Sequence, residues 1–172
     1  MRIFIAGATG AIGRELLPLL AEHEVTGMTR SRPELVLELG AEPAVCDVYD
    51  RERVFEAVAA ARPDVVVSLL TDLAERDFDA NNRIRREGVR NLVDAAVSAG
   101  ARRLLVESVD FELPPAGAAA LAEMERIADE SGLDVELLRF GLLWGPGTWY
   151  EEPPNDGAIH VRAAAEAVVA AL

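Results

Sequence analysis

The first thirteen residues impose the strongest constraint on the fold. A short apolar stretch, MRIFIA, leads directly into Gly7, Gly10 and Gly13, and leucines at helical spacing follow. A strand that turns sharply into a helix brings backbone N–H groups together at the helix start, and glycine lets an anion approach that backbone closely. The pattern predicts a strand, turn and helix that bind the pyrophosphate of a dinucleotide. An ordinary strand-to-helix turn is the alternative.

The rest of the chain alternates between β-branched apolar stretches and segments of helical periodicity. Strands are predicted at 2–6, 24–28, 43–46, 64–70, 102–106 and 134–139, and helices near 11–22, 32–39, 51–60, 80–98, 116–131 and 162–171. Right-handed crossovers place helices on both faces of a parallel sheet. We therefore expect an α/β fold of the doubly wound Rossmann type, with a mostly parallel sheet in the order 3-2-1-4-5-6.

Length and composition limit the possible classes of protein. The chain has 172 residues, 51% of them hydrophobic, and no linker-like segment divides it, so we expect a single domain over 1–172. The hydrophobic stretches are too short to span a bilayer and no signal-peptide pattern precedes the first strand, which predicts a cytoplasmic protein without a membrane partner. The net charge of −13 opposes binding to nucleic acid, because a phosphate backbone needs a concentrated basic surface.

Metal ligands are scarce in this sequence. The chain has one cysteine, Cys46, and two histidines, His23 and His160, and their spacing fits no metal site. Cys46 lies in a predicted buried strand, where packing is its expected role. We therefore predict neither a metal site nor a disulfide.

Polar residues after the second predicted strand bear on the choice of nucleotide. NAD-selective sites usually place Asp or Glu there, whereas this chain has Arg30, flanked by Thr29 and Ser31. A guanidinium can hold a 2′-phosphate through charge-assisted hydrogen bonds, so the segment favours NADP over NAD. Solvated residues at a helix start are the alternative.

A second polar residue, Asp47, follows the third predicted strand. Its carboxylate suits the amino group of adenine, and the adjacent Val48 suits the adenine ring. Asp47 could equally cap the helix that begins near Arg51. The sequence leaves both roles open.

Together these segments resemble the extended and atypical short-chain dehydrogenase/reductase superfamily, in particular its NAD-dependent epimerase/dehydratase branch. The resemblance covers nearly the whole chain and is carried by GATGAIG at 7–13, TRS at 29–31, CDV at 46–48, VVVSLL at 65–70, GVRNLVDAAVSAG at 88–100, RRLLVES at 102–108, SGLDVELLRFGLLWGPGT at 131–148 and IHVRAAAEAVVAAL at 159–172. It implies a nicotinamide cofactor. The implied contacts are Gly7, Thr9, Gly10, Ala11, Ile12, Gly13, Arg30, Asp47, Val48, Leu69, Leu70 and Thr71.

The chain departs from this family at its proton relay. Family members that transfer hydride use a Tyr-x-x-x-Lys pair on the helix after the fifth strand, in which the lysine lowers the pKa of the tyrosine. This chain has no lysine, and the expected segment, 114–121, has no tyrosine. A compositional bias toward arginine explains part of this absence. An asparagine expected three residues before Gly88 is replaced by Arg85.

Other polar groups near the end of the fifth predicted strand are candidates for catalysis. Ser108 and Asp110 are the catalytic candidates, with Glu107 and Glu112 beside them. A carboxyl group whose pKa is raised by burial can serve as an acid near neutral pH.

The resemblance therefore implies an NADP(H)-binding protein that acts as a reductase or epimerase-like oxidoreductase on a small carbonyl or sugar-like substrate, through a nonstandard acid. The alternative is a catalytically inactive subunit that binds a nucleotide or a protein partner. Extended members continue beyond the equivalent of Leu172 into a substrate-binding portion, so we expect that portion to be largely absent here. A homodimer through the helices near 80–98 and 116–131 is also implied, because family dimers often pair these helices.

Overall fold

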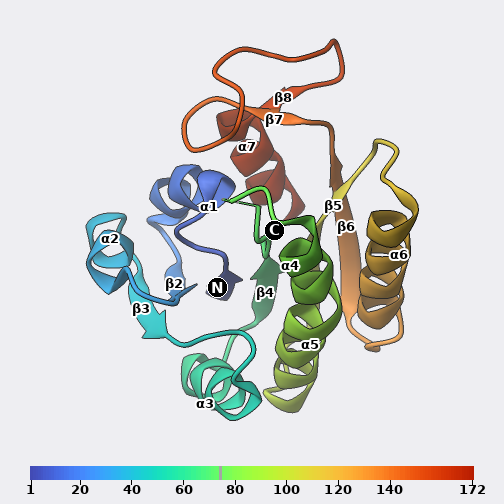
Figure 1. Cartoon of the computed structure of the whole chain (residues 1–172). Coiled ribbons are helices and arrows are strands. Elements are labelled where there is room, and N and C mark those ends of the chain that lie inside the picture. Colours follow the sequence, from blue (N-terminus) through green and yellow to red (C-terminus); the bar gives the residue numbers. More distant parts are fainter. Residues whose placement is uncertain (74) are drawn as a thin grey trace.

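A six-stranded parallel sheet forms the centre of the molecule (Figure 1). The computed structural model describes residues 1–73 and 75–172. The strands are β1 (Arg2–Ala6), β2 (Glu24–Thr29), β3 (Glu42–Val45), β4 (Val65–Ser68), β5 (Arg103–Val109) and β6 (Asp134–Phe140). Their order is β3-β2-β1-β4-β5-β6, and every pairing within this sheet is parallel. The predicted Rossmann-type order is therefore confirmed.

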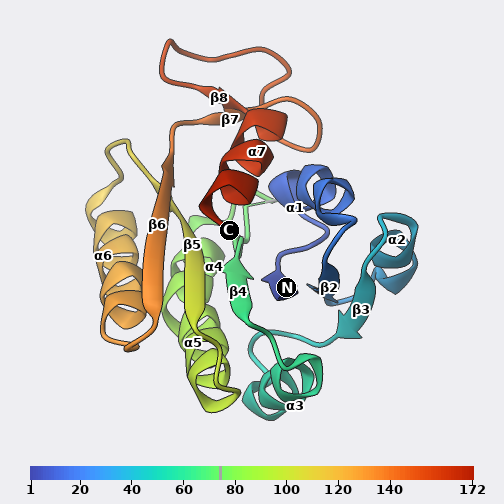
Figure 2. The ribbon, with the colours of Figure 1, turned by 180° about the vertical axis from the view of Figure 1, so that it is seen from behind.

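Helices cover both faces of the sheet (Figures 1 and 2). They are α1 (Ala11–Leu16), the 3₁₀ turn η1 (Leu17–Leu20), α2 (Pro33–Glu38), α3 (Arg51–Ala61), α4 (Phe78–Arg83), the π-helical turn η2 (Ile84–Gly88), α5 (Val89–Ser98), α6 (Pro115–Asp129) and α7 (Val161–Ala171). α1, η1, α2 and α7 pack on one face, and α3, α5 and α6 pack on the other. Within the described ranges, no helix combines the length and apolar character needed to cross a bilayer.

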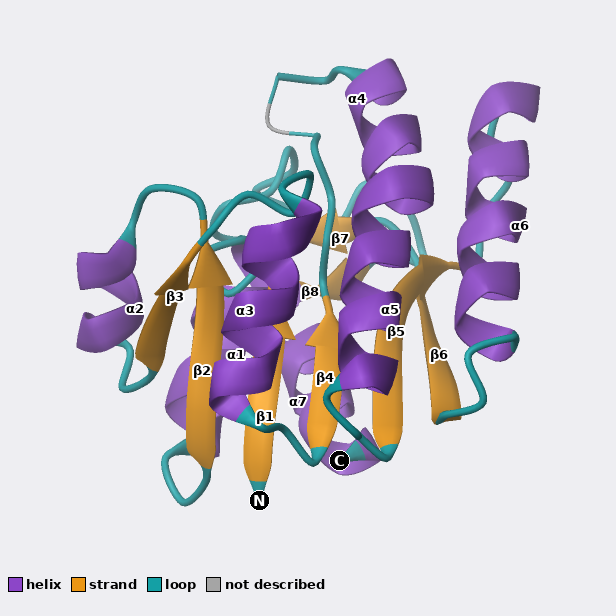
Figure 3. Ribbon diagram, turned by 90° about the horizontal axis from the view of Figure 1, so that it is seen from below, coloured by secondary structure: helices purple, strands orange, loops and turns teal. Residues whose placement is uncertain are grey.

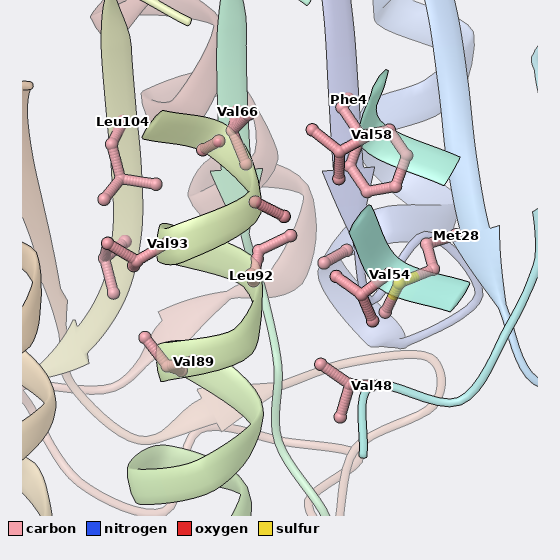
Figure 4. Packing of buried hydrophobic residues seen from close by; sticks show 14 of the residues in the cluster. Phe4, Met28, Val48, Val54, Val58, Val66, Val89, Leu92, Val93 and Leu104 are labelled. Atoms are coloured by element: carbon pink, nitrogen blue, oxygen red, sulfur yellow. The ribbon is translucent and has the colours of Figure 1, made fainter. Parts of the chain in front are cut away.

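Successive side chains of each strand point to opposite faces of the sheet, and this alternation divides the hydrophobic core into two layers. Phe4 and Val66 face α3 and α5, where they meet Leu92 (Figure 4). Their neighbours Ile5 and Val67 face the opposite layer, which α1 and α7 close. All five side chains are fully buried. Because helices cover both faces of the sheet, the sequences of these strands are continuous hydrophobic runs. The edge formed by the carboxyl ends of the strands is not covered in this way, and it is where open α/β sheets bind ligands.

The structure differs from the predicted boundaries in a few places. The helix predicted over 11–22 ends at Leu20, and its last turn is 3₁₀ because Pro18 has no N–H to donate. The segment predicted as one helix near 80–98 begins at Phe78 and contains the π turn η2. Two short strands, β7 (Leu143–Trp144) and β8 (Ile159–His160), form a separate parallel ladder that was not predicted. Two residues are too few to give a periodic pattern.

Candidate cofactor and active site

The loop between β1 and α1 is packed backbone against backbone. Gly7 has a φ of +90°, and a Cβ at this position would lie 2.4 Å from the carbonyl oxygen of Leu69. A Cβ on Gly13 would lie 2.4 Å from the carbonyl oxygen of Gly7. The Gly10 N–H donates to that same Gly7 oxygen at 3.0 Å and closes the turn. A side chain at Gly7 would therefore push the loop away from the end of β4. A side chain at Gly13 would clash with the backbone of the loop itself.

The start of α1 is free of a protein cap. Gly10 is the N-cap residue and offers no side-chain acceptor, and the first turn has no acidic residue. The Arg14 side chain holds the loop in place through a 2.9 Å hydrogen bond from Nε to the Thr9 carbonyl oxygen. N–H groups of the first helical turn have no intrahelical acceptor, so at this end they are available to an anion.

A cleft opens beside this loop at the carboxyl ends of β1, β4 and β5. It is lined by Gly7, Gly10, Ala11, Ile12, Gly13, Leu69, Thr71, Glu107 and Leu143. These strands are neighbours in the sheet, so residues distant in the sequence meet at one edge. Figure 3 shows the sheet and its helices from a direction that makes this edge easy to follow. Leu143 was not among the predicted contacts. The sequence signal that could have identified it is its place directly before the WGPG motif, in a segment that carries the family resemblance.

Arg30 extends from the end of β2 toward solvent. Its side chain is 64% exposed, and Nη1 lies 4.0 Å from Oδ2 of Asp72, which follows β4. Thr29 is buried, and its hydroxyl oxygen accepts from the Arg32 N–H at 3.1 Å, which fixes the turn into α2. Ser31 is exposed beside them. Among the contacts of the described residues, a long ion pair is what holds the guanidinium, so it can reorient toward a phosphate.

The segment after β3 is fixed by hydrogen bonds. The Asp47 carboxylate accepts from the Tyr49 N–H at 2.9 Å, and Asp50, not Asp47, caps α3 by accepting from the Arg53 N–H. The capping role considered for Asp47 is therefore wrong. Val48 is 2% exposed and packs in the core, and its carbonyl oxygen accepts from Asn91.

Glu107 is the ionisable side chain in the cleft. Burial raises its pKa from the ordinary 4.5 to about 7, and the positive charge of Arg85 partly opposes this rise. The Arg85 side chain lies in η2, and burial lowers its pKa. At neutral pH, Glu107 is therefore divided between its acid and base forms, as an acid–base group requires.

The two predicted catalytic candidates lie elsewhere. Ser108 is 2% exposed, and its hydroxyl donates to Oε1 of Glu125 on α6 at 2.6 Å. The other oxygen of Glu125 accepts from Arg139 at 3.0 Å. Asp110 is exposed after β5. Successive side chains of a strand point to opposite faces, so Ser108 faces α6 while Glu107 faces the cleft.

The segment 114–121, where the resemblance places a Tyr-x-x-x-Lys pair, forms the first turns of α6. These turns contain Pro115, Gly117 and alanines, and Gly117 lies close to Asn82 of α4. The tyrosines are elsewhere. Tyr49 stacks under the Arg83 guanidinium, and Tyr150 accepts through its backbone carbonyl oxygen in the loop after β7. Within residues 1–73 and 75–172, no cluster of His, Cys, Asp and Glu side chains is arranged to bind a metal.

The loop after β7 reaches over the end of β4. Nε1 of Trp149 donates to the Leu73 carbonyl oxygen at 3.0 Å, and its ring meets Phe78 edge-on and lies under the Arg76 guanidinium. A Cβ on Gly147 would lie 3.5 Å from Ala11 at the start of α1. The loop therefore contacts both the segment that follows β4 and the start of α1.

Comparisons with known proteins agree with this geometry. The profile of a family described as NAD(P)H-binding matches residues 7–172. A 3-diazoavenalumate denitrifying reductase from Streptomyces sp. is 38% identical over 94% of this chain and 62% of its own length. A dTDP-4-dehydrorhamnose reductase from Streptomyces griseus is 33% identical over 67% of this chain and 36% of its own length. The chain thus spans less than two thirds of either relative.

Solved structures show the same fold. The Bordetella bronchiseptica enzyme WbmH, in complex with NAD+, aligns with 99% of this chain and 71% of its own at a TM-score of 0.81 and 21% identity. UDP-glucose 4-epimerase from Thermus thermophilus, in complex with NAD, aligns with 100% of this chain and 74% of its own at a TM-score of 0.81 and 22% identity. The chain belongs to the NAD(P)H-binding family and has the Rossmann fold of NAD-dependent epimerase/dehydratase-like proteins.

Proposed function

We propose that this protein is an NADPH-dependent reductase of small electrophilic substrates. The observation that carries the proposal is the cleft itself, which joins the glycine loop at the start of α1 to the side chain of Glu107. The family supports a nicotinamide cofactor, and the bare backbone of the loop fits a pyrophosphate. The resemblance implies further cofactor contacts at Leu69, Leu70 and Thr71, and two of these line the cleft.

NADPH is proposed over NADH because of Arg30. A 2′-phosphate beside Arg30 would gain charge-assisted hydrogen bonds, and the competing carboxylate of Asp72 is 4.0 Å away. Asp47 and the backbone of Val48 would border the adenine. Asp47 keeps an acceptor oxygen beyond the one that the Tyr49 N–H occupies.

Glu107 would act as the acid in place of the missing tyrosine. When bound, NADPH supplies a hydride to the substrate. With a carbonyl or sugar-like substrate, the oxygen needs a proton as its negative charge develops, and protonated Glu107 would donate it. A pKa of about 7 keeps part of the Glu107 population protonated at neutral pH.

A diazo compound is a second candidate substrate. The 38% identical reductase is named for a diazo substrate and for removal of nitrogen. When a hydride adds to the carbon of an aryl diazonium ion, its electron pair forms the C–H bond and the C–N pair leaves with dinitrogen, so that step consumes no proton. A neutral diazo compound needs one proton first, to reach the diazonium form. Such a reaction requires no Tyr-x-x-x-Lys pair, and this chain has no lysine.

Two measurements test the proposal. Calorimetric titration with NADPH and NADH should show binding that is selective for NADPH. Oxidation of NADPH, followed at its nicotinamide absorbance, should then depend on the protein with either aryl diazonium salts or small aldehydes and ketones. Binding without turnover over both panels would favour the catalytically inactive nucleotide-binding subunit. Binding of neither cofactor would contradict the proposed function and favour a subunit that binds a protein partner.

A further inference from the structure

Asp72 places a carboxylate beside the guanidinium proposed to select NADPH. It follows β4, and its Oδ2 lies 4.0 Å from Nη1 of Arg30, which follows β2. β2 and β4 are the two neighbours of β1 in the sheet, so these side chains meet across the carboxyl end of β1. A separation of 4.0 Å is too long for a hydrogen bond. The donors of Arg30 and the acceptors of Asp72 are therefore not engaged with each other.

The backbone of Asp72 is held by a side chain of α4. Its N–H donates to Oδ1 of Asn81 at 3.0 Å, and Asn81 is only 4% exposed. The preceding residue, Thr71, lines the cleft together with the glycine loop. The side chain of Asp72 is 27% exposed, so its carboxylate keeps contact with solvent. Asp72 is thus anchored next to the cleft and beside Arg30, where its carboxylate can act on a ligand.

A group bound by Arg30 would lie close to the Asp72 carboxylate. A 2′-phosphate carries about −1.5 to −2 charges at neutral pH, so Asp72 would repel it and compete with it for Arg30. The 2′-hydroxyl of NADH is neutral and can donate a hydrogen bond to a carboxylate. Arg30 and Asp72 therefore act in opposite directions on the choice between the two cofactors.

We propose that Asp72 is a specificity-determining residue, and that the Arg30–Asp72 pair, not Arg30 alone, sets the preference between NADPH and NADH. Arg30 attracts the 2′-phosphate, whereas Asp72 limits that attraction and accepts from the 2′-hydroxyl of NADH. The preference for NADPH is therefore smaller than an unopposed arginine would give. The inference rests on the proposed function, since it concerns the cofactor site of that same cleft.

Calorimetric titration of NADPH and NADH tests the role of Asp72 without requiring turnover. Asp72→Asn keeps the size of the side chain and removes its charge. We expect this variant to bind NADPH about threefold to tenfold more tightly than the wild type, because it removes one like charge near the phosphate at a partly exposed site. NADH affinity should stay equal or fall by up to about threefold, so the ratio of NADPH affinity to NADH affinity rises.

Two further variants separate this effect from net charge and from a change in structure. Asp129→Asn removes the same charge at an exposed position at the end of α6, which packs on β5 and β6, and should keep the affinity ratio of the wild type. Asp72→Glu retains the charge and should keep the ratio within about twofold. In about 1 M NaCl the ratios of the wild type and Asp72→Asn should converge, because the Debye length falls to about 3 Å.

Three results would overturn the role of Asp72. The first is an affinity ratio that Asp72→Asn leaves unchanged, and the second is a rise of the same size in Asp129→Asn. The third is a difference between the wild type and Asp72→Asn that persists at high salt.

The outcome for Asp72 can be separated from that of the proposed function. If the wild type prefers NADPH and Asp72→Asn leaves the ratio unchanged, the proposed cofactor preference stands and the role of Asp72 fails. A ratio that rises in Asp72→Asn while the wild type reduces no substrate would support the role of Asp72 and contradict the reductase activity alone. A wild type that binds neither cofactor would overturn both.

Discussion

Glu107 differs from the other carboxylates of the described chain in lining the cleft while its pKa is raised. Between its ordinary pKa of 4.5 and about 7, the folded protein binds more protons at this side chain than the unfolded protein does. The free energy of unfolding should therefore fall as pH rises through this window, and Glu107 should add no further change above it.

Glu107→Gln should remove this dependence. We expect the wild type to lose up to about 3 kcal/mol relative to this variant between pH 4.5 and pH 8. Urea unfolding at several pH values, analysed as the difference between the two proteins, checks it. Glu112→Gln, at an exposed position after β5, is the control. Parallel curves for wild type and Glu107→Gln would show that Glu107 titrates normally.

Arg30 carries the preference for NADPH. Removing one charge-assisted contact costs about 1.5–3 kcal/mol, so Arg30→Ala should weaken NADPH binding about tenfold to a hundredfold and leave NADH nearly unchanged. Parallel calorimetric titrations of the two cofactors measure this. Arg53→Ala, which removes an exposed arginine paired with Glu56 on α3, should alter neither affinity. An equal loss for NADPH and NADH would remove Arg30 from the 2′-phosphate role.

At the scale of elements, the turn from β1 into α1 is fixed by the absence of side chains. Gly13→Ala would place a Cβ 2.4 Å from the Gly7 carbonyl oxygen, and backbone cannot move aside as a side chain can. We expect a loss of about 1–3 kcal/mol in the free energy of unfolding, together with loss of NADPH binding. Thermal unfolding and calorimetry check both.

Gly117→Ala is the matched control for this turn. Gly117 lies in α6, and a Cβ there would make only ordinary contacts, the nearest at 3.4 Å from Leu113. Alanine also favours a helix over glycine, so this variant should fold at least as stably as the wild type and bind NADPH normally. If Gly13→Ala behaved like this control, the close packing of the loop would not be required.

Sequence periodicity predicted the long elements well and the short ones poorly. β1, β5 and β6 and the helices that pack on them bury many apolar side chains, so their periodic pattern is strong. The π turn η2 leaves no such pattern, because one inserted residue looks like part of a continuous helix. The ladder of β7 and β8 depends on contacts between segments that are distant in the sequence.

At the scale of the whole molecule, α5 and α6 form a neighbouring pair of helices on one face. Arg86 and Arg90 of the η2–α5 segment pair with Glu123 of α6 across this face. Ala118, Ala119 and Ala122 of α6 are exposed, and small side chains allow a second helix to approach closely. The homodimer through these helices, which the family resemblance implies, stays a prediction.

The dimer can be tested by enlarging one of these alanines. Ala119→Arg should convert a dimer into a monomer, because a long charged side chain cannot be accommodated between closely packed helices. Light scattering coupled to size-exclusion chromatography measures the mass. Ala60→Arg, at an exposed position of α3, should keep the mass of the wild type. A wild type that is monomeric at all concentrations tested would contradict the expectation.

The sequence by itself determined the fold class and the position of the glycine loop, since these follow from periodicity and from local backbone requirements. The strand order was the one that the Rossmann fold implies. It also named Glu107 as a carboxyl group near the site. Only the tertiary structure decided that Glu107 faces the cleft while Ser108 faces α6, and that Arg85 lies buried in the π turn η2. The direction of a side chain and the burial of a charge depend on which elements pack against it, and a local pattern holds no record of those distant contacts.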